Sequence, residues 1–297
     1  MDLSLRGVLL MWEWRPEVTI SLGMLALLYG LGWQRLRRRG AHRLANGWRL
    51  VSYYGGILAL VVALLSAVDA LQSLLFTMHM VQHLLLTMVA APLIVLANPF
   101  PIVLWSFPRE QRRAFSLLLA RGRAGRRLLV RVTHSRIAWA LFVGTFVLWH
   151  APTMYEAALY SDIVHDIEHI SFFVTALLFW WHITQAPPRV HGRLGYGARI
   201  ALLAGAFVIN EALSVALAFA SSPWYSYYTT VPRIWGLSAL ADQKLGGAIM
   251  WVPGGMMYVV AIVVLLARLL DAEEKKPPLP EGEWATEDVM RAPGWQR

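Results

Sequence analysis

Seven blocks of apolar residues constrain this chain more than any other feature. A helix needs about 20 mainly apolar residues to cross the roughly 30 Å of hydrocarbon in a bilayer. The blocks fall at 17–34, 50–70, 75–96, 137–151, 163–185, 199–220 and 245–270. Because backbone polar groups in lipid must be satisfied within the segment, we predict an all-α, polytopic membrane helical bundle with about seven transmembrane helices.

Composition supports one bundle in lipid instead of two soluble domains. Of the 297 residues, 57% are hydrophobic and 15% are charged, whereas soluble domains carry about a quarter charged residues. The chain has no cysteine, which excludes disulfides, thiolate metal sites, iron–sulfur clusters and cysteine nucleophiles. Any metal must therefore be held by His, Met, Asp or Glu.

The distribution of basic residues predicts the orientation. Segments 35–49, 109–136 and 187–199 carry six, nine and three arginines, whereas the alternate connections are nearly empty. In total, 23 basic residues fall on one side of the membrane and four on the other. By the positive-inside rule the 23 face the cytoplasm, so an odd number of spans puts the N-terminus outside and the C-terminus in the cytoplasm. The net charge of +9 then reflects topology and not nucleic-acid binding.

Three segments flank or interrupt the bundle at 17–270. We expect residues 1–16 to form an extracytoplasmic interfacial segment, and they show no signal-peptide cleavage pattern. Loop 98–136 alternates arginines with apolar residues, which predicts an amphipathic helix on the anionic lipid of the inner leaflet. Residues 271–297, with Pro277, Pro278 and Pro280 close together, are expected to form a disordered cytoplasmic tail.

Five histidines are expected to share one depth. His79 and His83 lie four residues apart near the start of the third block, as do His165 and His169 in the fifth, and His150 ends the fourth. Four-residue spacing puts both side chains on one helical face, which allows one helix to offer two nitrogens to one ion. With the alternating topology, all five fall in the outer leaflet region. A lone intramembrane histidine is often a helix-to-helix hydrogen bonder, but two spaced pairs and a fifth ring favour a metal site.

The metal is predicted to be copper, with zinc as the alternative. Imidazole suits several metals, whereas a thioether favours Cu(I). Met80 beside His79, and Met256 in the last block, are the candidate sulfur ligands, although methionine is also an ordinary packing residue. His182 is excluded, because it lies 17 residues after His165, roughly 25 Å further along the helix axis.

Acidic residues near these histidines are candidates for supporting the ligands or handling protons. They are Asp166, Glu168, Glu211 and Asp242. Residues 165–169 also spell the H-x-x-E-H pattern of inverzincin metalloproteases, which keeps open a membrane-embedded zinc hydrolase with His150 as third ligand and Glu168 as base. Haem is less favoured. Bis-histidine haem usually takes one histidine from each of two facing helices, whereas each pair here lies on a single helix. Metal binding without catalysis is the preferred interpretation, and a metal-free scaffold remains an alternative.

Ordered motifs from about Trp12 to Leu270 resemble the polytopic CtaG family of assembly factors for haem-copper cytochrome c oxidase. This is not the single-span copper chaperone that shares the name. The motifs are the basic segment after the first block, HMVQH at 79–83 with AAPL at 90–93, WHAP at 149–152, HDIEH at 165–169 and DQKLGG at 242–247, in which Lys244 is unusual. The resemblance implies a bacterial cytoplasmic (inner) membrane protein that helps to mature the oxidase by delivering copper on the outer face, with oxidase subunits as partners. Whether it forms a homo-oligomer is left open.

Overall fold

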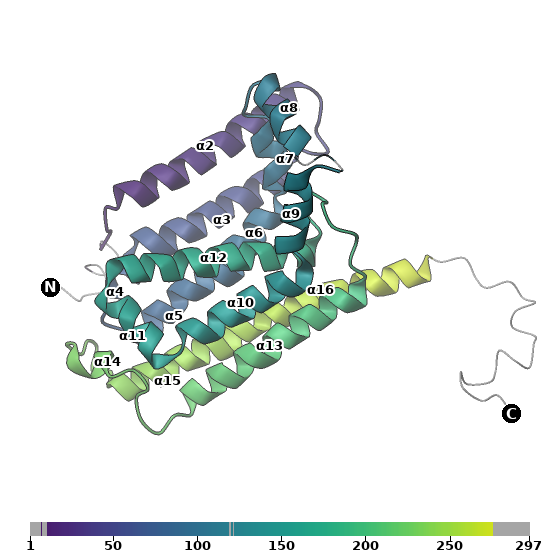
Figure 1. Ribbon diagram of the computed structural model, residues 1–297. Coiled ribbons are helices and arrows are strands. Elements are labelled where there is room, and N and C mark those ends of the chain that lie inside the picture. Colours follow the sequence, from purple (N-terminus) through teal and green to yellow (C-terminus); the bar gives the residue numbers. More distant parts are fainter. Residues whose placement is uncertain (1–6, 8–10, 119, 121, 276–297) are drawn as a thin grey trace, which may run out of the picture.

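The computed structural model is all-helical across the residues it describes, which are Gly7, 11–118, 120 and 122–275. Long helices run side by side along one axis (Figure 1). They are α2 (Pro16–Arg38), α3 (Gly47–Leu65), α10 (Ser135–Trp149), α12 (Asp162–Thr184), α13 (Tyr196–Ala218) and α16 (Gly255–Glu274). The α-helical bundle that the periodicity predicts is therefore confirmed.

Two long helical runs, the second of which ends in α16, contain a π-helical segment. One runs through α5 (Phe76–Leu84), η1 (Leu85–Ala90) and α6 (Ala91–Leu96), and the other through α15 (Ala239–Ile249), η2 (Met250–Gly254) and α16. A proline lies just after η1 and another inside η2, at Pro92 and Pro253. Proline cannot donate to the helical ladder, which locally disturbs it. The Trp180 indole donates to the Thr87 carbonyl at 2.9 Å, so a side chain satisfies the backbone at η1.

Short helices close the two ends of the bundle. α4 (Ala67–Leu71), α11 (Pro152–Tyr160) and α14 (Tyr227–Thr230) lie at one end, and α7 (Pro99–Leu104), α8 (Arg109–Leu118) and α9 (Ala124–Val132) at the other (Figure 1). The predicted amphipathic helix in loop 98–136 is thus three short helices. α8 and α9 are arginine-rich and expose apolar side chains, among them Phe115 and Leu128.

Five helices of the described residues are long and apolar enough to cross a membrane, or six if the bent pair α9 and α10 counts as one span. The five are Gly47–Leu71, Phe76–Leu96, Asp162–Thr184, Tyr196–Ala218 and Ala239–Glu274. The chain is therefore a multi-pass membrane protein. The predicted first span corresponds to α2, which is 23 residues long but falls outside these five.

Both predicted flanking segments reach beyond the described residues. α2 begins at Pro16, the last residue of the predicted N-terminal segment, and 1–6 and 8–10 lie outside the description. α16 continues to Glu274, so the first four residues of the predicted tail are helical, and 276–297 lie outside the description.

Paired glycines in the DQKLGG motif bring α15 close to two neighbours. A Cβ at Gly246 would collide with the Phe76 ring of α5, and a Cβ at Gly247 would lie 2.6 Å from the Ala218 backbone nitrogen at the end of α13. Small residues at such contacts let helix backbones approach closely in a membrane bundle. The motif therefore fixes α15 against α5, the helix that carries His79 and His83.

Candidate metal centre

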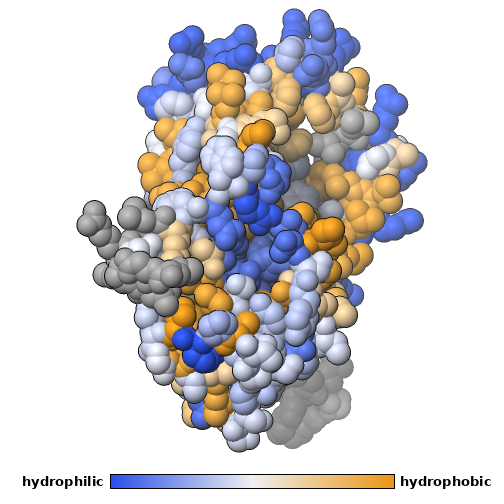
Figure 2. Space-filling model, turned by 90° about the vertical axis from the view of Figure 1, so that its left-hand side faces the viewer, coloured by the Kyte–Doolittle hydropathy of each residue, from blue (hydrophilic) through white to orange (hydrophobic). Residues whose placement is uncertain are grey.

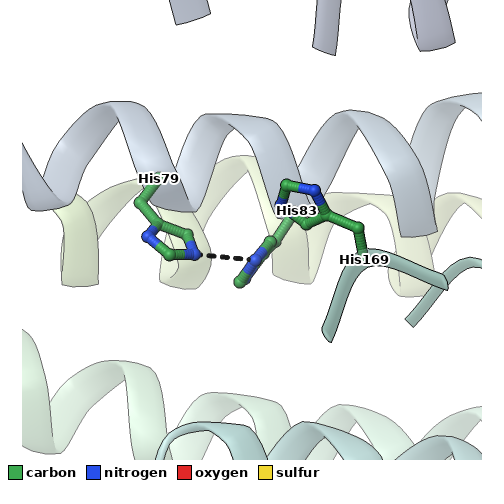
Figure 3. Close-up of side chains that lie close together, drawn as sticks. All are labelled: His79, His83 and His169. Atoms are coloured by element: carbon green, nitrogen blue, oxygen red, sulfur yellow. Dashed lines mark hydrogen bonds between the residues drawn. The ribbon is translucent and has the colours of Figure 1, made fainter. Parts of the chain in front are cut away.

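Helix α5 presents two buried imidazoles on one face. His79 and His83 lie one turn apart, are 0% and 6% exposed, and place their Nε2 atoms 2.9 Å from each other (Figure 3). The start of α5 is held by Asp242 of α15, whose carboxylate accepts from the backbone N–H groups of Phe76 at 2.8 Å and Thr77 at 3.0 Å. Asp242 thus caps α5 from a neighbouring helix and sets its position along the bundle axis.

Helix α12 brings a carboxylate and two more imidazoles to the same place. Glu168 is 0% exposed, with Oε2 3.4 Å from His79 Nε2 and Oε1 3.6 Å from His83 Nε2. His169 combines with His79 and His83 into a group whose nitrogens all lie within 4.8 Å of one another, and Figure 3 shows the three rings together. His165 forms an equally tight group with His79 and Glu168.

The spacing of these atoms fits the coordination shell of a transition metal. Ligand atoms that each lie about 2.0 Å from one ion are roughly 3.3 Å apart in a tetrahedral site. The distances joining His79 Nε2, His83 Nε2 and the Glu168 carboxylate are 2.9, 3.4 and 3.6 Å. The 2.9 Å contact is a hydrogen bond between the two imidazoles, whereas neither Glu168 oxygen has a hydrogen-bond partner, which is rare for buried polar atoms.

The unsatisfied buried atoms of the cluster also indicate a bound cation. Both Glu168 oxygens, both His169 nitrogens and His165 Nε2 are buried without a hydrogen-bond partner. Leaving such groups unpaired costs about 1–3 kcal/mol each, so their accumulation at one point calls for an explanation. A bound cation would satisfy several of them at once.

His150 extends the cluster towards a small cavity. Its Nδ1 lies 2.7 Å from the Phe146 carbonyl and so donates to it, which leaves Nε2 as an unprotonated, buried and unpartnered ligand atom. The ring centroid is 6.5 Å from that of His83. Both rings line a cavity of about 30 Å³ together with Met80 and Met250, which is room for about one or two water molecules.

The structure places three candidates away from the ligand atoms. Met256 is 57% exposed and does not line the cavity, where Met250 of η2 stands instead. The carboxylate of Asp242 caps α5 by accepting from two backbone N–H groups and not from an imidazole. Glu211 packs against Gly255, where an added Cβ would collide with its carboxylate, so it belongs to the α13–α16 contact.

Two other candidates are placed near the cluster but in different roles. Glu168, predicted to support the ligands, lies among the ligand nitrogens themselves. Asp166 is on the other side of α12, where its carboxylate accepts from Arg15 at 2.6 Å. His182, excluded from the site, is hydrogen-bonded to the Thr133 carbonyl at 2.7 Å.

Two residues without a predicted role also support the site. Gln82, between the two histidines of α5, donates its amide to Ala63 O at 2.8 Å and to the Asp69 carboxylate at 2.5 Å, which ties α5 to α3 and α4. The fully buried Tyr155 of α11 packs on His79, with ring centroids 4.9 Å apart. The HMVQH motif contains Gln82, but nothing in the sequence near Tyr155 marks it.

The fold and this cluster define a multi-pass helical membrane protein with a buried, histidine-rich candidate metal centre. The chain belongs to the cytochrome c oxidase caa3 assembly factor (Caa3_CtaG) family, whose model matches residues 27–272. This confirms the family that the motifs suggest.

Mycobacterial relatives match over most of this chain. An uncharacterized protein of Mycobacterium bovis is 29% identical over 280 residues, which cover 89% of this chain and 40% of the relative. One of Mycobacterium leprae is 28% identical over 271 residues, covering 86% and 39%. The chain thus spans about two fifths of the length of these relatives. No solved structure matches it significantly.

Proposed function

We propose that this protein is an assembly factor for haem-copper cytochrome c oxidase that binds copper at the cluster of His79, His83, Glu168 and His169. The observation that carries the proposal is the convergence of the Nε2 atoms of His79 and His83 on the buried Glu168 carboxylate. Membership of the assembly factor family supports the oxidase as destination, with oxidase subunits as the partners that receive the metal.

The donor set favours copper. Imidazoles from α5 and α12 surround the point of convergence, and the thioethers of Met80 and Met250 line the adjoining cavity with His83 and His150. Thioethers are soft ligands that select Cu(I) over zinc. A cluster with imidazole on one side and thioether on the other suits an ion that is bound and then passed on.

We place the cluster on the outer side of the bacterial cytoplasmic membrane. The arginine-rich helices α8 and α9 lie at the opposite end of the bundle from α4 and α11, which flank the cluster (Figure 1). By the positive-inside rule the arginine-rich end faces the cytoplasm, where α8 and α9 contact anionic lipid. α2 begins at the cluster end and α16 ends at the arginine-rich end, which supports an odd number of spans with α2 as the seventh.

A zinc hydrolase is the second candidate, because Glu168 occupies the position of a base among possible ligands. The ligand chemistry favours copper over it. Thioethers of Met80 and Met250 line the cavity at His83 and His150, whereas catalytic zinc sites use imidazole, carboxylate or thiolate ligands.

Elemental analysis of the purified full-length protein from copper-replete cells tests the proposal. Wild type is expected to carry copper, and His79→Ala/His83→Ala to lose it. The matched control is His134→Ala/His191→Ala, which also removes two imidazoles but at the start of α10 and in the α12–α13 connection. Copper-free wild type, or equal copper in both double variants, would refute copper binding at the cluster.

A further inference from the structure

A hydrophilic cleft opens beside the metal centre at the α4–α11 end of the bundle. It has a volume of about 510 Å³ and is lined by residues at the start of α2 and just before it, in and just after α4, and in the α11–α12 region. Figure 2 shows this end of the molecule, with a hollow of hydrophilic residues at its centre. An opening of this kind on a membrane protein connects water to the interior of the bundle.

Carboxylates dominate the lining of the cleft. The described residues that line it include one guanidinium, that of Arg15, and five carboxylates, those of Glu13, Glu17, Asp69, Asp162 and Asp166. Arg15 lies 2.6 Å from Asp166, 3.1 Å from Glu17 and 4.0 Å from Asp69, measured between charged atoms. The guanidinium therefore occupies the place where an incoming cation would find the highest density of negative charge.

His165 joins the cleft to the buried cluster. Its side chain lines the cleft although the residue is only 6% exposed, and its Nε2 is buried without a hydrogen-bond partner. A ligand nitrogen of the same ring lies within 4.8 Å of those of His79 and Glu168. One imidazole thus touches the open space on one side and the candidate metal centre on the other.

The floor of the cleft is also connected to the site helix. Asp69 is 6% exposed and accepts a hydrogen bond of 2.5 Å from Gln82, which lies between His79 and His83 on α5. One hydrogen bond therefore links the Asp69 carboxylate at the cleft floor to α5, the helix that bears His79 and His83.

We propose that this acidic cleft is the port through which a transition-metal cation reaches the cluster, with His165 as the first imidazole it meets and Arg15 as the counter-cation it displaces. This inference rests on the proposed function, since it gives the bound metal its route. The carboxylates raise the local concentration of the cation, as negatively lined clefts do. When the ion pairs with Asp166 in place of Arg15, the path to His165 opens. No covalent bond is made or broken.

Blocking the port tests the proposal. Because the chain has no cysteine, a single introduced cysteine can be labelled selectively. Ser73 lines the cleft and is half-buried. In detergent-solubilised protein, where both faces are accessible, we expect Ser73→Cys, fully labelled with a positively charged thiol reagent, to take up Cu(I) at least about 10-fold more slowly than wild type, with the same final stoichiometry. The control is Ser116→Cys on the exposed face of α8, labelled identically, in which uptake keeps the wild-type rate. Uptake is followed by competition with a chromogenic Cu(I) chelator.

Charge removal provides a second, independent readout. Asp162→Asn/Asp166→Asn is expected to slow uptake several-fold at low salt and to converge with wild type at high salt, because salt screens the attraction. Asp271→Asn/Glu274→Gln at the end of α16 removes the same charge far from the cleft and leaves the rate unchanged. Wild-type uptake rates in both the labelled Ser73→Cys protein and the cleft double variant would overturn the port while leaving copper binding intact. Wild-type protein that takes up no copper at equilibrium would overturn both proposals.

Discussion

Replacing Glu168 with leucine should have opposite effects on the metal-free and the copper-loaded protein. The Glu168 carboxylate is fully buried, and neither oxygen has a hydrogen-bond partner. A group held in that state weakens the fold unless a ligand satisfies it. Leucine removes the unsatisfied oxygens and keeps most of the apolar volume.

The size of the effect follows from the burial. An unsatisfied buried polar group costs about 1–3 kcal/mol, so metal-free Glu168→Leu should be more stable than wild type by about that amount. At 2–4 °C per kcal/mol for a chain of 150–250 residues, this is a rise of several degrees in Tm. Copper at 100 times its Kd adds about 2.7 kcal/mol to wild type, and the variant should gain clearly less.

Thermal unfolding in detergent, with and without copper, measures both effects. The matched control is Gln82→Leu, which removes a buried polar side chain whose amide does have partners, at 2.8 and 2.5 Å. Gln82→Leu should melt below wild type in both conditions. Metal-free Glu168→Leu that also melts below wild type would refute the reasoning, because Glu168 would then be an ordinary stabilising core residue.

Three further predictions concern the residues around the cluster. Asp242→Ala leaves the Phe76 and Thr77 N–H groups without their cap, so it should cost about 0.5–2 kcal/mol in thermal unfolding and weaken copper binding in a titration, whereas Asp242→Asn should do less of both. Met250→Ala should lower Cu(I) affinity measured by chelator competition, while Met256→Ala, at an exposed position, should leave it unchanged. His182→Ala should lower Tm, because the bond to the Thr133 carbonyl is lost, yet retain the full copper content by elemental analysis.

Hydrophobic periodicity and histidine spacing predict most of the fold and much of the cluster. A period of 3.6 residues shows that His79 and His83 share a face, and the alternation of spans shows that His165 and His169 reach the same depth. Both inferences need only local sequence and the direction of each span. The structure brings these four residues together.

The remaining features of the site arise from contacts about which the local sequence carries no information. Met250 and Met256 look equivalent in an apolar block, but the π-helical turn at Met250–Gly254 shifts the faces of the helix, and only Met250 lines the cavity. Asp242 caps a helix that begins 166 residues earlier in the chain, a contact that no motif spacing reveals. The side chain of Glu168 reaches His79 only because α5 and α12 meet at a particular rotation.

Copper K-edge X-ray absorption on the loaded full-length protein tests most directly whether these imidazoles bind one ion. We predict the multiple-scattering pattern of several imidazole ligands in wild type and a reduced imidazole count in His79→Ala/His83→Ala. A spectrum dominated by sulfur, or one that the double variant leaves unchanged, would contradict a copper site at the meeting point of α5 and α12.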